Sequence, residues 1–385
     1  MPTIKLYDEN AYLSEFSATV MECQKENGAY KILLDQTAFF PEAGGQKSDT
    51  GVIGDAEIFD VQIENENIYH YANSPLNTGE QLKCKINFDE RYKKMQIHTG
   101  EHIVSGVMHS LYNLSNVGFH LGSDEVTLDF DAVLSREQLD KAEELANEII
   151  YKNVPVICYY PDKNTLATLD YRSKKELEGD VRIVEIEGYD KCACCAPHVS
   201  RTGEVGIIKL THFEKNKGGT RITMLCAKDA LRDYREKYRN VAEISALLCA
   251  KADDTADAVR TLLNEKSELS GVITNLKHTV CDLKAEGVEA SAEPFIFFED
   301  NFNIPDMRNL VNRIITKRPN VFIFSLSREN EYNFVCGGNN MKKWMQLFTE
   351  RFGAKGGGSD KMIQGTLYTT KTEIQDFISL NIDKK

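Results

Sequence analysis

Apolar and polar residues alternate through most of the first 90 residues of the chain. The segments YKILLDQTAFF and AEIFDVQIENENIYHYA are rich in β-branched and aromatic residues, which favour strands. The glycine-rich stretch PEAGGQKSDTG lies between them and predicts a loop. We therefore expect the first 90 residues to form a β domain.

The apolar spacing changes to a helical period after residue 90. The stretch QIHTGEHIVSGVMH carries apolar residues along one helix, and VTLDFDA then alternates as a half-buried strand does. The segment SREQLDKAEELANEII begins with Ser135 and has Gln138 three positions later, which predicts a capping box at the start of a helix. Further strands are predicted in VPVICYY, VRIVEI, VGIIKL and TRITMLCA.

A heptad pattern marks the later part of residues 228–285. One seam consists of Leu262, Leu269, Leu276 and Leu283, and a second seam consists of Val259, Ile273 and Val280, interrupted by Lys266. A preceding helix at 228–251 ends in KADDTAD, where Asp254 or Thr255 is expected to cap the next helix. An antiparallel, coiled-coil-like arm and ordinary amphipathic helices packed on a domain fit this pattern equally well.

The last hundred residues predict a small α/β domain. EGVEASAEP (286–294) has the composition of a linker, FIFFE, NVFIFSLS and NFVCGGN predict strands, and MKKWMQLFTERFG predicts a helix. We expect AKGGGSDKMIQG to be a glycine-rich loop that enters a helix.

Charge and cysteine content narrow the possible classes of function. The net charge of −13 argues against a general nucleic-acid binder. Acidic and basic residues are equal in number over 286–385, so the acidic excess lies in the first 285 residues and a local basic patch could still bind RNA. The scattered cysteines, the absence of a secretory signal and the absence of an apolar run long enough to span a membrane predict a cytoplasmic protein.

Histidine and cysteine residues at two places in the chain suggest a metal site. His98 and His102 are one helical turn apart, and Cys194 and His198 have the spacing C-x-x-x-H. Either pair alone is weak evidence, but both together favour zinc, which prefers four imidazole and thiolate donors. Alternatively the histidines decorate a surface, and Cys192 and Cys195 form a redox pair.

Several stretches resemble the editing domain of alanyl-tRNA synthetase and its free-standing relatives, the AlaX-type editing proteins. These are the two metal motifs, LDQTAFFPEAGGQKSDTGVI, VGFHLGSDEVTLDFD and CCAPHVSRTGEVGIIKL. AKGGGSDKMIQG resembles the signature of the C-terminal module shared by alanyl-tRNA synthetases and DHH-type phosphodiesterases. The resemblance covers nearly the whole chain. One departure is the second metal motif, where the family commonly has Cys-Gly-Gly-Thr-His and this chain has Cys194-Cys195-Ala196-Pro197-His198.

The resemblance implies an α+β protein with four parts. These are an N-terminal β-barrel-like domain (1–90) with a glycine-rich loop, a zinc-containing α+β editing domain (91–227), a helical arm (228–285) and a small C-terminal α/β, DHH-associated module (286–385). The implied activity is hydrolysis of the ester in seryl- or glycyl-tRNA(Ala), with Zn²⁺ held by His98, His102, Cys194 and His198. Because the chain starts at the editing signature, we expect no aminoacylation activity. Because it lacks the half of the DHH-type phosphodiesterases that would carry nuclease chemistry, we expect no phosphodiesterase activity.

The resemblance also implies roles for residues outside the ligand set. Thr99 is expected to form a hydrogen bond with the hydroxyl group of a serine substrate, or alternatively only with the backbone of the first helical turn. Gln46 is expected to act as a neutral donor and acceptor on the glycine-rich loop, or alternatively to belong only to a tight turn. RNA contact is expected from Arg313, Lys317, Arg318, Lys342, Lys343, Arg351, Lys355 and Lys361. A homodimer through the arm or the last module is possible. The alternative function is a non-catalytic tRNA-binding protein with a structural zinc; a third is hydrolysis of a different ester.

Overall fold

The computed structural model describes residues 2–122, 126–173 and 180–382. The residues Ser123, Asp124 and Glu125 of the stretch VGFHLGSDEVTLDFD lie outside this description. Contacts within the chain separate two compact units, residues 1–240 and 241–385, and both mix helices with sheets. The α+β class is therefore confirmed, whereas the four-part division stays a prediction. No described helix is both long enough and apolar enough to cross a membrane.

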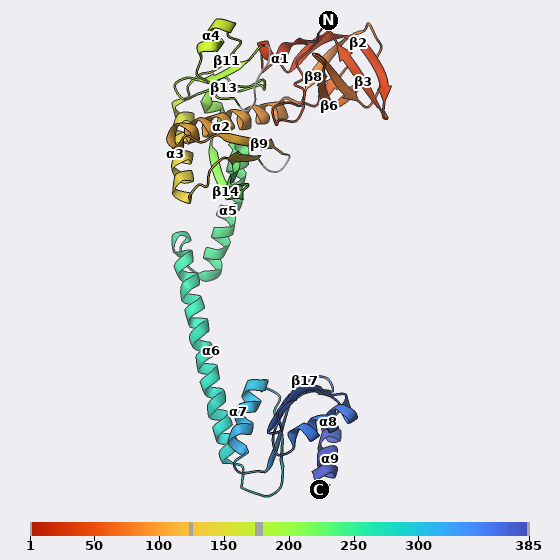
Figure 1. Cartoon of the computed structure of the whole chain (residues 1–385), viewed down its shortest axis with the longest axis vertical. Coiled ribbons are helices and arrows are strands. Elements are labelled where there is room, and N and C mark those ends of the chain that lie inside the picture. Colours follow the sequence, from red (N-terminus) through yellow and green to blue (C-terminus); the bar gives the residue numbers. More distant parts are fainter. Residues whose placement is uncertain (1, 123–125, 174–179, 383–385) are drawn as a thin grey trace. The chain divides into compact units, whose positions relative to one another are not determined.

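The first unit begins with a closed barrel (Figure 1). Its strands, in order around the barrel, are β2 (Glu15–Glu26), β3 (Ala29–Leu34), β7 (Asn67–Ala72), β6 (Ala56–Glu64), β5 (Gly51–Ile53) and β8 (Gln81–Ile86). The short elements β1 (Ile4–Lys5), α1 (Leu6–Glu9) and β4 (Gln36–Thr37) accompany them. Alternate residues such as Val20, Ile32 and Ile68 are fully buried, which is the two-residue period that the sequence predicts.

The long helix α2 (Phe88–Tyr112) follows the barrel and extends from it to α3 (Arg136–Lys152) (Figure 1). A four-stranded antiparallel sheet has the order β14 (Ile208–Asn216), β15 (Gly219–Cys226), β10 (Val126–Phe130) and β9 (Asn116–Leu121). A three-stranded sheet consists of β11 (Val156–Tyr159), β12 (Ile183–Ile186) and β13 (Asp190–Ala193). The short helices α4 (Lys163–Thr168) and η1 (Thr202–Val205) complete this part. The predicted capping box of Ser135 and Gln138 is confirmed at the start of α3.

Two long helices follow, α5 (Ala227–Leu248) and α6 (Thr255–Glu286), with the 3₁₀ turn η2 (Ala252–Asp254) between them. The helix break at KADDTAD is confirmed, and Asp254 is the N-cap residue of α6, although its side chain makes no capping hydrogen bond. Both heptad seams of α6 are solvent-exposed, with Leu269 and Leu276 62% and 59% exposed. The opposite side of the helix, with Cys281 and Ala285, packs into the core of the second unit.

The rest of the second unit is a five-stranded sheet with helices. The sheet has the order β16 (Phe295–Phe298), β17 (Asn320–Arg328), β18 (Glu331–Gly338), β20 (Met362–Tyr368) and β19 (Lys355–Gly358). The helices are α7 (Ile304–Ile314), α8 (Met341–Phe352) and α9 (Lys371–Ile382). The predicted helix after the glycine stretch is wrong, because β19 and β20 form an antiparallel pair there. Gly356 and Gly365 face each other in this pair, and a Cβ on either would lie 2.6–2.8 Å from the other's Cα, so the glycines permit close strand pairing.

Candidate metal centre

The helix α2 presents His98 and His102 on one face, four residues apart, and both side chains are 2% exposed. Two glycines of the helix allow strands to approach this region. A Cβ on Gly100 would lie 2.9 Å from Cys226 Sγ, and a Cβ on Gly106 would lie 2.8 Å from Asp190 Cβ. The helix is therefore buried where the histidines are, instead of showing them on a surface.

Cys194 and His198 lie in the loop that follows β13. The Arg182 guanidinium donates to the carbonyl oxygens of Cys194 (3.1 Å) and Ala196 (2.8 Å), and the Cys194 amide donates to the Arg182 carbonyl (3.0 Å). These bonds fix the loop against the preceding segment and orient Cys194 and His198 toward α2.

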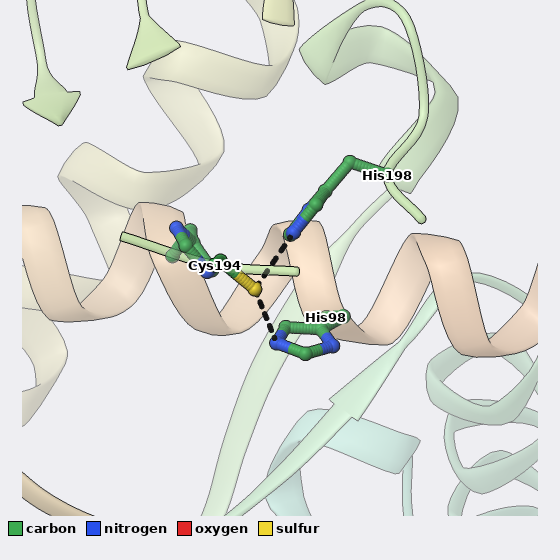
Figure 2. Close-up of side chains that lie close together, drawn as sticks. His98, Cys194 and His198 are labelled. Atoms are coloured by element: carbon green, nitrogen blue, oxygen red, sulfur yellow. Dashed lines mark hydrogen bonds between the residues drawn. The ribbon is translucent and has the colours of Figure 1, made fainter. Parts of the chain in front are cut away.

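The four side chains converge on one point. Their potential ligand atoms all lie within 4.8 Å of one another. Cys194 Sγ is 3.5 Å from His98 Nε2 and 3.5 Å from His198 Nε2. Figure 2 shows the Cys194 side chain between the two imidazoles, with both contacts dashed. The His102 ring centroid is 4.7 Å from that of His198 and 5.5 Å from that of His98. Three imidazoles and one thiol at these separations form the donor set that zinc prefers.

Each imidazole meets a second polar group through its other nitrogen. His98 Nδ1 lies 3.0 Å from Gln46 Oε1, and His198 Nδ1 lies 3.0 Å from Thr99 Oγ1. His102 Nδ1 is 3.5 Å from Asp190 Oδ2. Because an amide oxygen only accepts, Nδ1 of His98 carries the proton, and its Nε2 keeps a lone pair for a metal. The Asp190 carboxylate favours the same tautomer of His102 electrostatically.

Burial sets the protonation of the site. It lowers the pKa of His198 well below its usual value, and the neighbouring His102 and His98 lower it further, so this imidazole stays neutral. Burial raises the pKa of the Cys194 thiol, with Cys195 adding to the effect. The metal-free thiol therefore keeps its proton at neutral pH, and binding of a metal would release it.

Asp190, behind His102, remains ionised although it is buried. Burial raises its pKa, but hydrogen bonds with His102 and Arg172 outweigh that effect and lower the pKa overall. Arg172 holds the carboxylate with two bonds of 2.7 Å, from Nε to Oδ1 and from Nη2 to Oδ2. This pair gives His102 a fixed orientation.

A tight glycine turn brings Gln46 to the centre. Ala43 and Gln46 are bridged by two backbone hydrogen bonds, and Gly44 and Gly45 between them have φ values of 63° and 81°. A Cβ on Gly45 would lie 2.6 Å from the carbonyl oxygen of Phe119, so only glycine fits this approach. Gln46 is fully buried, and its Nε2 has no hydrogen-bond partner among the described residues.

Thr99 lies behind His198, one of the four potential ligands. Its side chain is fully buried, and its Oγ1 lies near His198 Nδ1 and accepts from the Val199 amide at 3.3 Å. Cys192 is buried on β13 and Cys195 is exposed, and neither belongs to the group of four ligands. His109 and His120 lie outside that group as well.

The eight basic residues expected to contact RNA fall into two sets. Arg313 pairs with Asp282, Lys317 donates to the Ala285 carbonyl at 2.7 Å, and Arg318 donates to the Glu293 carbonyl at 3.3 Å, so these side chains hold the second unit together. The other set is solvent-exposed and consists of Lys342, Lys343, Arg351, Lys355 and Lys361. The first set is therefore less available to phosphates than the sequence suggests.

Sequence reasoning missed the groups that orient the ligands. No sequence motif identifies Asp190, Arg172 or Arg182. Their roles depend on how β12 and β13 pair beside α2. Glu101 lies within HTGEH, and its position between the two histidines was the only available signal.

Comparison with known proteins finds two matches to domains of aminoacyl-tRNA synthetases. Residues 181–223 match the threonyl and alanyl tRNA synthetase second additional domain, and residues 5–90 match the class II (A) tRNA synthetases. Alanyl-tRNA editing protein AlaX-L of Pyrococcus horikoshii is 28% identical, over 97% of this chain and 96% of its own. Alanyl-tRNA editing protein Aarsd1-A of Xenopus laevis is 27% identical over 92% of each chain. The chain is therefore similar to alanyl-tRNA editing proteins over nearly its whole length.

The same likeness extends to a longer protein. The alanine–tRNA ligase of Pyrococcus abyssi is 28% identical over 95% of this chain, which spans only 42% of the ligase.

Proposed function

We propose that this chain is a hydrolase that removes a wrong amino acid, serine or glycine, from tRNA(Ala) through a zinc site. The observation that carries the proposal is the buried convergence of His98, His102, Cys194 and His198 within 4.8 Å. The likeness to alanyl-tRNA editing proteins supports alanyl-tRNA as the substrate class.

The residues present fit zinc by the chemistry of their donors and of the groups behind them. His98 and His102 would each bind through Nε2, since their Nδ1 atoms face Gln46 and Asp190. When bound, zinc would polarise the ester carbonyl or lower the pKa of a water molecule.

The protein groups around the centre have distinct roles in this proposal. The Gln46 amide Nε2 is a buried donor without a partner among the described residues, and it would bond the ester oxygen as negative charge develops there. Thr99 and Asp190 are positioning residues in this proposal, because Thr99 Oγ1 contacts His198 Nδ1 and the Asp190 carboxylate lies 3.5 Å from His102 Nδ1.

We assign RNA contact to the exposed set on α8 and around β19, and not to the set of Arg313, Lys317 and Arg318. Reversing charge at Lys342, Lys343 and Lys361 should weaken tRNA affinity and flatten its dependence on salt. Charge reversal at the exposed Lys251 is the control. Unchanged affinity at matched salt would remove this role.

We further propose a homodimer through the exposed seams of α6. Val and Ile at one seam position with Leu at the other favour two parallel helices, and the single Lys266 would fix the register. Replacing Leu269 and Leu276 with glutamate should convert a dimer to a monomer in sedimentation equilibrium. The proposal also includes a cytoplasmic location, which the absence of disulfides among the ten cysteines supports.

The decisive experiment compares metal-free and zinc-loaded protein on seryl-, glycyl- and alanyl-tRNA(Ala). The proposal predicts zinc-dependent release of serine and glycine and little release of alanine. Tight tRNA binding without hydrolysis would favour the alternative, a non-catalytic tRNA-binding protein with a structural zinc. Hydrolysis of a different aminoacyl-tRNA in preference to these would favour the third possibility.

A further inference from the structure

The first half of α5 carries a row of basic residues on an acidic protein. The spacing i, i+4, i+7 and i+11 places them along one side of the helix, and the row consists of Lys228, Arg232, Arg235 and Arg239. All four side chains are exposed, and the row spans about 16 Å of helix. Because the net charge of the chain is −13, this row is a local concentration of positive charge and not part of a generally basic surface.

The acidic residues nearby leave most of the basic row without a counter-charge. Asp229 pairs with Lys93 of α2 at 2.7 Å and with Arg232 at 3.0 Å, so it offsets one member of the row in part. The other three members form no ion pair with any residue that the structure describes. Glu236 and Glu243, the exposed acidic residues on the following turns, therefore do not neutralise the row.

Two exposed tyrosines border the basic row. Tyr234 and Tyr238 are 65% and 62% exposed, and their rings are stacked, with centroids 6.4 Å apart and an angle of 26° between the ring planes. Cations beside exposed aromatic rings are typical of surfaces that bind single-stranded nucleic acid, because phosphates meet the cations and every base has a face that stacks on a ring. An acidic protein partner would match the charges, whereas RNA matches both the charges and the flat rings.

The start of α5 lies beside the metal centre. Cys226, the residue before the helix, packs against α2 at Gly100, where a Cβ would lie 2.9 Å from the Cys226 Sγ. The ion pair of Asp229 joins the first turn of α5 to Lys93, five positions before His98. A cavity of about 410 Å³ lies at this junction, and its lining includes Asp229, Lys93, Ile97, Lys47 and Ser48. An RNA bound along the basic row therefore has one end in the same part of the first unit as the four potential ligands.

We propose that the basic row of α5, together with Tyr234 and Tyr238, binds the acceptor end of the tRNA. The inference rests on the proposed function, because the ester to be hydrolysed is at the 3′ end of the acceptor strand. The cations hold phosphates, and the two rings stack on unpaired nucleotides of that strand. This surface belongs to the first unit and is separate from the exposed basic set on α8 and around β19.

The first test compares R235Q/R239Q with wild type in the full, zinc-loaded chain. Fluorescence anisotropy measures the binding of uncharged tRNA(Ala), and of an acceptor-stem minihelix with the same 3′ end, at several salt concentrations. Loss of two phosphate contacts should weaken the binding of both RNAs by about tenfold and reduce the slope of log K against log salt concentration by about 1.5 to 2. The matched control, K237Q/R260Q, removes two exposed cations that already form ion pairs and should change neither quantity.

The second test separates RNA binding from effects on the metal centre. R235Q/R239Q should lower kcat/KM for seryl-tRNA(Ala) by about the same factor and leave kcat/KM for 3′-O-seryl-adenosine, which has no phosphates, unchanged. Replacing Tyr234 and Tyr238 together with alanine should weaken minihelix binding by about 5- to 100-fold. The double phenylalanine variant keeps both ring faces and should bind as wild type does.

Four outcomes would overturn the proposal. Unchanged RNA affinity and salt dependence in R235Q/R239Q would refute it, and a loss confined to whole tRNA would place the contact outside the acceptor end. Equal losses of activity on both esters would mean that α5 acts through the metal centre. Altered self-association in sedimentation equilibrium, with unchanged RNA affinity, would mean that a second copy of the chain covers this face. If wild type hydrolyses neither ester, the proposed function fails, and the binding measurements still test α5.

Discussion

Replacing Arg91 with methionine tests how the barrel is joined to α2. Arg91 and Asp49 form an ion pair in which the side chains are 0% and 1% exposed. Arg91 Nε donates to Asp49 Oδ2 at 2.8 Å, Nη1 to the Ala11 carbonyl at 3.1 Å and Nη2 to the Ala38 carbonyl at 2.6 Å. One side chain therefore connects the helix that carries His98 with the loop that carries Gln46.

The magnitude follows from what the substitution would leave behind. Asp49 would remain buried with the Phe40 amide at 2.7 Å as its remaining donor, and two carbonyl groups would lose a partner. Breaking a buried pair on one side costs about 3–5 kcal/mol. Adding Asp49→Asn to R91M removes the stranded charge, so the double variant should recover part of this loss.

Urea unfolding can assign the loss to one unit. The only tryptophan, Trp344, lies on α8 in the second unit, so its fluorescence reports that unit, whereas far-UV circular dichroism reports both. With a slope of about 3 kcal/mol/M, R91M should lower the first unit's midpoint by about 1.3 M and leave the fluorescence midpoint unchanged. A loss below about 1 kcal/mol, or a double variant less stable than R91M, would refute the reasoning.

Further predictions concern the ligands, the orienting groups and the barrel core. Purified protein should hold about one zinc per chain by elemental analysis, which Cys194→Ala removes and Cys192→Ala does not; the reverse result would contradict the ligand assignment. Thr99→Val should weaken zinc binding by about 10- to 100-fold and slow seryl- and glycyl-tRNA(Ala) hydrolysis equally, whereas a larger loss on the seryl ester would return Thr99 to reading the serine hydroxyl. Burial lowers the pKa of His70 in the barrel from 6.5 to about 4. The unfolded chain therefore takes up a proton below pH 6.5 that the folded chain excludes, and stability should fall by about 3 kcal/mol more in wild type than in His70→Leu between pH 7 and pH 4; parallel pH profiles of unfolding would contradict this.

Local patterns predicted the elements well where a single period was sustained. The capping box of Ser135 and the heptads of α6 needed only residues close in sequence, and both are present. The glycine stretch at 355–358 was misjudged because glycine loops precede helices as well as strands. Its strand pairing with residues 362–368 depends on the absence of side chains at Gly356 and Gly365, which no local period reveals.

The four potential ligands could be grouped from the sequence because the spacing i to i+4 in each motif limits which atoms can meet. The orienting groups were not, since Gln46 reaches His98 across 52 positions and Thr99 reaches His198 across 99. The internal contacts of two basic residues could not be predicted for a related reason. Lys317 and Arg318 resemble a surface cluster in sequence, but the carbonyls at Ala285 and Glu293 that they bind come from the preceding helix end and linker.

The construction of the centre divides the orientation of its imidazoles among separate residues. The ligands meet from two segments about a hundred positions apart, and each imidazole is oriented by a residue from a different place: Gln46 from the glycine turn, Thr99 from α2 and Asp190 from β13. Loss of one orienting residue should therefore disturb one imidazole and leave the partners of the other two in place. T99V should accordingly lower the affinity for zinc without abolishing binding.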